Sequence, residues 1–203
     1  QGRCFWLRVY EIPEATKTSS GRVIQNILSL PKEDKIKAYI NVEDLTDKEF
    51  LERNYIMFCT KQGMIKKTVV EAFSRPRMGG IIAITINEGD QLLEARLTNG
   101  ENEIFIATRN GNAIRFNESK VRAMGRSAAG VRGVSLEDEH DAVVGMVCID
   151  PAVNSQTILV ISEKGNGKRS EYEDYRLTNR GGKGVKTMQV TDKTGAVIAI
   201  KAV

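Results

Sequence analysis

The sequence predicts an all-β fold, built as a propeller-like array of repeated four-stranded units. Glycines mark four copies of one pattern: a first glycine follows an apolar run, and a second stands 17 or 19 residues later. Little else in the chain has helical periodicity, and β-rich repetition at a period of about 50 residues is typical of propellers and related arrays. The marker glycines are Gly2, Gly63, Gly111 and Gly165, then Gly21, Gly80, Gly130 and Gly184.

The first two strands of each unit flank the first glycine. The runs that enter the turn read alike at 55–60, 103–108 and 157–162, and their continuous apolarity predicts strands buried on both faces. Asn110-Gly111 predicts a two-residue type I′ hairpin, which needs positive φ at both central positions. Alternating residues over 64–69 and 113–116 predict the return strands.

The last two strands of each unit follow the second glycine. In the second copy they are expected over 81–86 and 92–97, separated by a polar turn at 87–90. The corresponding turns are 31–34, 137–141 and 192–195. We therefore assign the copies to 1–54, 55–102, 103–155 and 156–203, within a single domain that spans 1–203.

One surface helix is expected between the first two copies. These copies are separated by extra residues over 42–54, and Thr46-Asp47-Lys48-Glu49 within them has a capping-box pattern. The chain begins at Gln1, without a methionine and in mid-repeat, so we expect it to be a piece of a longer protein.

Composition excludes several classes of protein. No run approaches the roughly 20 apolar residues of a membrane helix. The three cysteines lie outside metal-ligand spacings, and we expect them to be reduced and buried in a cytoplasmic protein. His140 falls at an expected hairpin tip. We find no catalytic constellation, no metal site and no cofactor motif.

The distribution of positive charge is more informative than the net charge of +4. Cations recur four residues after the first glycine, and again four and eight residues before the second. Radial repetition would place equivalent positions along one edge, so the sequence predicts a positive belt. The candidate DNA-binding residues are Lys17, Lys66, Lys67, Arg75, Arg77, Arg115, Lys120, Arg122, Arg126, Arg132, Lys168, Arg169, Arg176, Arg180, Lys183 and Lys186.

Such a belt fits duplex DNA, which offers one phosphate per roughly 1.7 Å of axis. The basic connections also hold small residues, as in 127–130 and 179–184, which let backbone N–H groups approach a phosphate. Aromatic residues are few and no recognition helix is expected. The sequence therefore predicts recognition of the duplex backbone with a preference for bent shapes.

Several segments resemble the C-terminal domain of the A subunit of bacterial DNA gyrase, a type IIA topoisomerase. They are 9–16, 66–69, 119–125, 130–134 and 166–169, in the right order and covering essentially the whole chain. The resemblance implies a six-bladed β-pinwheel in which neighbouring blades exchange a strand, with about four blades here. The family's signature box, Gln-Arg-Arg-Gly-Gly-Lys-Gly, would lie upstream of Gln1. Residues 179–184 match this motif in part.

The resemblance also implies a function. The domain would wrap duplex DNA around its rim, directing strand passage and negative supercoiling, without catalysing a reaction itself. Its partners would be DNA, the gyrase B subunit and the remainder of the A subunit, in an ATP-dependent A2B2 enzyme in the cytoplasm at the nucleoid. Two alternatives stay open. One is the equivalent domain of the A subunit of topoisomerase IV, and the other is a propeller-like platform that binds an acidic protein.

Overall fold

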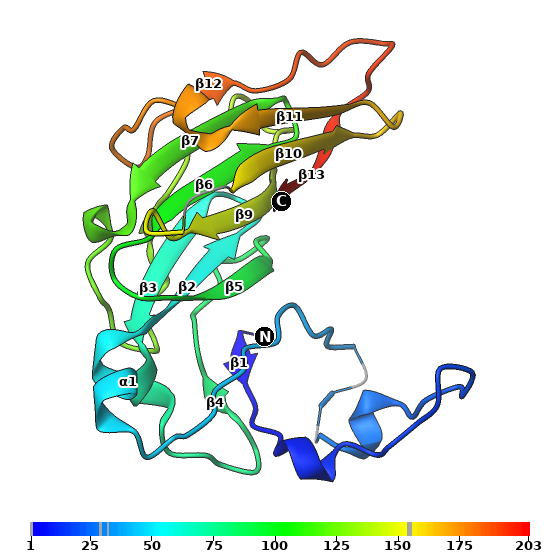
Figure 1. Ribbon diagram of the computed structural model, residues 1–203, viewed down its shortest axis with the longest axis vertical. Helices are drawn as coiled ribbons and strands as arrows, with labels where there is room; N and C mark the ends of the chain where they lie inside the picture. Colours follow the sequence, from blue (N-terminus) through cyan, green and yellow to red (C-terminus); the bar gives the residue numbers. More distant parts are fainter. Residues whose placement is uncertain (1, 29, 32, 154–155) are drawn as a thin grey trace.

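The computed structural model describes residues 2–28, 30–31, 33–153 and 156–203. These residues form four antiparallel sheets: the first two follow one another upward along the long axis in Figure 1, and the last two lie together near the top. The strands are β1 (Arg3–Cys4), β2 (Tyr55–Thr60), β3 (Met64–Val69), β4 (Ile81–Ile82), β5 (Leu92–Thr98), β6 (Glu103–Thr108), β7 (Asn112–Asn117), β8 (Val131–Arg132), β9 (Val143–Ile149), β10 (Thr157–Ser162), β11 (Gly167–Glu171), β12 (Val185–Lys186) and β13 (Val197–Ala202). The expected all-β fold is confirmed, and β2, β6 and β10 have the predicted bounds.

The first three sheets along the chain are each completed by a strand from the next copy. The two four-stranded sheets have the orders β5-β2-β3-β8 and β12-β7-β6-β9, followed by a three-stranded sheet β11-β10-β13. In each case the short strand after the second glycine pairs with the strand that follows the first glycine of the preceding copy. These pairs are β4 with β1, β8 with β3 and β12 with β7. This is the strand exchange that a β-pinwheel requires, and it joins neighbouring copies through backbone hydrogen bonds.

Six of the eight marker glycines, all but Gly21 and Gly165, stand where two copies approach closely. A Cβ on Gly111 would lie 2.1 Å from Met188 O, and one on Gly184 would lie 2.2 Å from Ala113 O. Both residues also have positive φ, 85° and 79°, as do the other six marker glycines. Only glycine combines this conformation with the missing side chain. At these six positions the glycine repeat in the sequence therefore reflects contacts between copies.

The predicted type I′ turn at Asn110-Gly111 is wrong. Gly111 N–H donates to Thr108 O at 3.0 Å, so Arg109 and Asn110 are the central residues and Gly111 is the fourth residue of the turn. Ala107 pairs with Ala113, which leaves room for a longer loop with glycine in the left-handed region. Gly63 and Gly165 donate to the same position, Thr60 O and Ser162 O.

Two other expectations need correction. The strand predicted over 81–86 pairs only at Ile81–Ile82, since the backbone then leaves the sheet edge and Ala83 and Ile84 both donate to Gly2 O.

The first copy does not form a four-stranded blade: apart from β1, residues 2–28, 30–31 and 33–54 hold no strand. In the other copies the long last strand pairs with the run entering the first turn, and the described residues of the first copy hold no such run. Lys32, in the expected turn 31–34, lies outside the described residues.

The predicted helix is present as α1 (Lys48–Arg53), although its cap differs. The carboxylate of Asp47, not the hydroxyl of Thr46, accepts from Phe50 N–H at 3.1 Å. The remaining helical turns are short 3-10 elements: η1 (Val9–Glu11), η2 (Ile24–Asn26), η3 (Val70–Phe73), η4 (Glu118–Lys120) and η5 (Tyr172–Asp174).

The array has an inner and an outer side. The sheets end on one side in β5, β9 and β13, and β9 packs against both of the others. They end on the other side in the short strands β8 and β12, beside the basic connections. Apolar clusters fill the space between successive sheets, one around Met57 and Ile104 and another around Phe105 and Ile158. The connections that carry the predicted charge therefore lie on the outer edge.

Candidate nucleic-acid interface

The basic connections are fixed to the outer edge in the same way in successive copies. Met124 N–H donates to Lys67 O at 2.8 Å, and Thr178 N–H donates to Arg115 O at 2.9 Å, one copy further on. A second pair of hydrogen bonds repeats as well, from the hydroxyl of Thr85 to Ser127 O and from that of Ser135 to Gly181 O, both 2.7 Å. The spacing of the cations along this edge is thus set by backbone contacts that recur with the repeat.

Most of the predicted cations are exposed on the connections or on the short outer strands. Arg122, Arg176 and Lys183 are among the predicted cations whose side chains have no hydrogen bond or ion pair with any residue that the structure describes. The exposed set comprises Lys17, Arg75, Arg77, Lys120, Arg122, Arg132, Lys168, Arg169, Arg176, Lys183 and Lys186, while Arg115, Arg126 and Arg180 are partly buried.

Lys66 is fully buried, and its assignment to the DNA-contacting surface does not fit its position. Its ammonium donates to Ala83 O at 2.5 Å and to Arg126 O at 2.6 Å, and it lies 5.3 Å from the ring centroid of Phe58. Burial, with a smaller contribution from the charge of Arg126, lowers the pKa of the Lys66 side chain to about 8. A side chain with no exposed atoms cannot reach a phosphate, so Lys66 joins two copies instead.

Lys67 and Arg115 also act inside the protein rather than on its surface. They stand at the same place in successive copies, and each donates to backbone carbonyls in the next copy: Lys67 to Glu118 O at 3.1 Å, and Arg115 to Tyr172 O and Tyr175 O at 3.1 and 2.8 Å. Lys67 lies 4.7 Å from the ring centroid of Tyr55, and Arg115 forms a 2.6 Å ion pair with Glu103.

The repeated cation four residues after the first glycine is therefore a clamp on the 3-10 turn of the following copy. Arg169 occupies the same place in the last copy, where its Nε donates to Thr157 Oγ1 at 2.6 Å. A charge that recurs at equivalent positions can serve the repeat itself, and the sequence alone does not separate this use from ligand binding.

Two further candidates share their donors with the backbone. Arg180 donates from Nε to Lys120 O and from Nη1 to Arg132 O, both at 3.0 Å. Lys186 donates to Asn110 O at 3.0 Å and lies 3.9 Å from a carboxylate oxygen of Glu137. Both stay on the outer edge, with fewer donors free for a ligand.

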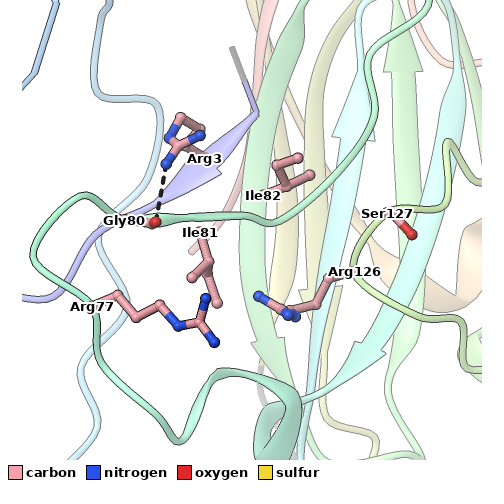
Figure 2. Close-up of a pocket in the computed structure, with 7 residues that line it drawn as sticks. All are labelled: Arg3, Arg77, Gly80, Ile81, Ile82, Arg126 and Ser127. Carbon is pink, nitrogen blue, oxygen red and sulfur yellow. Dashed lines mark hydrogen bonds between the residues drawn. The ribbon is translucent and has the colours of Figure 1, made fainter.

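Arg77 and Arg126 behave differently, because both guanidinium groups face the same hollow. Figure 2 shows them on either side of Ile81, extending from two successive connections. Arg3 lines the hollow from the opposite side and donates to Gly79 O and Gly80 O at 2.6 and 3.0 Å. Sequence reasoning missed Arg3. Its one signal was a cation directly after a marker glycine, which the other copies do not repeat.

The structure places the sulfur and imidazole groups away from any shared site. The cysteines are free thiols, and burial raises the pKa of Cys4 to about 11 and those of Cys59 and Cys148 further. His140 is exposed beside Glu139, at the tip between β8 and β9. Among the described residues no cluster of three potential metal ligands occurs, and no helix is long and apolar enough to cross a membrane.

Comparisons with known proteins agree with this geometry. A family model described as the DNA gyrase C-terminal domain, beta-propeller, matches residues 1–40, 54–99, 102–150 and 156–203. The A subunits of DNA gyrase from Staphylococcus epidermidis and Staphylococcus aureus are 42% and 41% identical over all 203 residues. The chain spans 22% of the length of these curated relatives.

Solved structures give the same result. The C-terminal domain of DNA topoisomerase IV superposes with a TM-score of 0.86 at 27% identity, and the DNA gyrase A C-terminal domain with 0.80 at 25%. Both alignments cover 100% of this chain, and 61% and 62% of those chains. With its exchanged strands and repeated outer connections, this chain belongs to the β-propeller (β-pinwheel) family of DNA gyrase A C-terminal domains.

Proposed function

We propose that this chain is a non-catalytic DNA-binding unit that bends duplex DNA along its outer edge. The observation that carries the proposal is the row of exposed cations on connections held at equivalent places in successive copies, with Arg122 and Arg176 as its clearest pair. A curved row of cations neutralises the phosphates of a duplex that follows it, and these phosphate interactions offset the cost of bending. We propose that residues 1–203 act as one domain in this role.

We further propose that this unit works within a gyrase of two A and two B subunits. Wrapping would present a second duplex segment to the cleavage site in a fixed crossing sense, which makes ATP-dependent strand passage directional and introduces negative supercoils. The location would be the cytoplasm, at the nucleoid. The resemblance to the topoisomerase IV domain supports one alternative, the same unit in that enzyme. Supercoiling of relaxed DNA by the whole reconstituted enzyme distinguishes the two.

The first experiment measures affinity for linear duplexes against salt. If the edge neutralises at least about four phosphates, log K falls with log salt with a slope of about −0.9 per phosphate, or roughly −3.6. Affinity should also rise from a duplex of about 12 bp to one of about 40 bp, because only the longer one can follow the edge. A flat salt response, or equal affinity for both lengths, contradicts the proposal.

A charge-matched pair of variants then tests the position of the DNA contacts. Replacing Arg122, Arg176 and Lys183 with alanine should weaken binding of the long duplex by roughly a hundredfold or more, at about 1 kcal/mol for each phosphate contact. Replacing Lys61, Arg109 and Lys193, exposed cations on inter-strand turns, should change binding less than about threefold. Equal losses would mean that net charge alone attracts DNA. An acidic protein surface could then bind this edge equally well.

A further inference from the structure

Two adjoining hollows of about 400 Å³ each lie where the second-copy connection meets the third-copy connection. They share three lining residues, Arg77, Ile81 and Arg126, and Arg75 lines the second of them. β4 lies across this place and is paired to β1, so the backbone around the hollows is held by hydrogen bonds. The hollows open on the outer edge, beside the exposed cations.

Arg77 and Arg126 both face this space without a partner. Among the residues that the structure describes, neither guanidinium has a hydrogen bond or an ion pair. A third cation lies behind them, because the buried ammonium of Lys66 is held 2.6 Å from Arg126 O. Of the described residues that line the two hollows, the one with an acidic side chain is Glu71, in the second. Convergence of like charges raises the energy of the site unless an anion binds there.

The next junction along the edge does not repeat this arrangement in the described part of the chain. Its counterpart of Arg126 is Arg180, whose guanidinium donates to Lys120 O and Arg132 O. Its counterpart of Arg77 is Ser127 in the third copy, three residues before Gly130, so one of the two cations is missing there. The open pair of guanidinium groups therefore distinguishes the junction between the second and third copies from the one that follows it.

The chemistry of the pair selects the anion. Planar guanidinium groups bind tetrahedral oxyanions through paired N–H donors, and two of them can hold different oxygens of one phosphate. The shallow position on the outer edge suits a phosphate that belongs to a polymer lying along that edge.

We propose that Arg77 and Arg126 together hold one backbone phosphate of the bent duplex, anchoring it at this junction. This inference rests on the proposed function and adds where the DNA is fixed. The other exposed cations of the edge each contact a separate phosphate as the duplex follows the array. The anchor makes binding asymmetric along the edge, since the junction bearing Arg180 lacks the second arginine.

Sharing one phosphate has a distinctive consequence for the salt dependence. Replacing both arginines with alanine removes two charges but only one phosphate contact, so the slope of log K against log salt should become shallower by about 0.9. The matched double variant, Arg122→Ala with Arg176→Ala, should make it shallower by about 1.8. The single variants Arg77→Ala and Arg126→Ala should each weaken binding about fivefold to tenfold, and the pair by less than the product of the two. Alanine at position 126 keeps the carbonyl that Lys66 binds, and thermal melting checks that both doubles fold.

An NMR titration of the arginine Nε–Hε signals identifies the source of the phosphate. A duplex of about 40 bp should shift the signals of Arg77 and Arg126 in parallel, and inorganic phosphate should shift the same two weakly and be displaced by the duplex.

The outcomes separate the anchor from the proposed function. If the duplex binds with both signals unmoved, or if the double variant makes the slope shallower by about 1.8, the anchor is overturned while the proposed function stands. If inorganic phosphate binds and the duplex does not displace it, the site takes free phosphate and the assignment to DNA is wrong. If the duplex does not bind the wild-type protein at all, the proposed function fails together with the anchor.

Discussion

The junction between the second and third copies and the junction between the third and fourth copies use different chemistry for the same task. In the first, the buried ammonium of Lys66 joins Ala83 O to Arg126 O. In the second, Ile114 stands in the place of Lys66, and Gly181 N–H donates directly to Gly133 O at 2.6 Å. The Lys66 ammonium binds the backbone of Arg126 and leaves its guanidinium free, whereas the guanidinium of Arg180 is used by the backbone.

The difference shows how a repeat can be varied without losing the fold. Each junction needs its carbonyls satisfied, because an unpaired buried carbonyl costs free energy. A buried lysine satisfies them at one junction and a backbone N–H at the other, and the surface arginine is free at the first and bound to carbonyls at the second. Copies with nearly the same backbone can therefore differ in what they bind.

The largest expected effect comes from making the first junction resemble the second. Lys66→Ile removes two charge-assisted hydrogen bonds and leaves Ala83 O and Arg126 O without the ammonium, so urea denaturation should show a loss of roughly 3 kcal/mol in the free energy of unfolding. Lys168→Ile changes a position near the same place in the last copy, where the side chain is exposed, and should cost less than about 0.5 kcal/mol. Similar losses at the two positions would contradict the role given to Lys66.

A smaller effect on the free energy of unfolding should distinguish Arg180 from Arg126. Arg180→Ala loses hydrogen bonds to Lys120 O and Arg132 O, and should lower the free energy of unfolding by about 1 kcal/mol, because these bonds are partly exposed to solvent. Arg126→Ala removes a guanidinium that has no hydrogen bond to the described residues and relieves repulsion with Arg77, so its stability should match or slightly exceed that of the wild type. Thermal denaturation at low salt measures both, and a larger loss for Arg126→Ala would reverse the comparison.

The last effect is the pH dependence of stability that Lys66 contributes. Its pKa of about 8 in the folded protein lies below the ordinary value of 10.5, so between these values the unfolded chain binds more protons. Stability due to this group therefore rises with pH from about 8 to 10.5, by at most about 1.4 kcal/mol per pH unit. Comparing wild type with Lys66→Ile at about pH 7, 8 and 9 isolates this contribution, because the other titrating groups are common to both proteins. A stability difference that does not change in favour of the wild type as pH rises would mean that the Lys66 pKa is not lowered.

Short-range patterns made much of the fold predictable. The glycine spacing indicated four copies, and the apolar runs predicted the bounds of β2, β6 and β10, because a strand buried on both faces leaves a continuous apolar segment. The helix at 48–53 followed from its capping residues, with an error of one residue at the cap. The hairpin type was missed because Asn-Gly is compatible with more than one turn, and the pairing of Ala107 with Ala113 selected the longer loop.

The tertiary structure decided which charges can reach a ligand. Lys66, Lys67 and Arg115 look like surface cations in an alternating strand, yet the next copy covers them and accepts their hydrogen bonds with its own carbonyl groups. The pairing of Arg77 with Arg126 joins residues about fifty positions apart, which is one repeat. Arg3 reaches the same hollow only because β1 pairs with β4.

The sequence by itself determined the repeat, the all-β fold and an excess of cations at repeating positions, because these depend on neighbours in the chain. The exchange of strands between copies decided which of those cations hold the array together and which face outward, because burial depends on what the next copy places against each side chain.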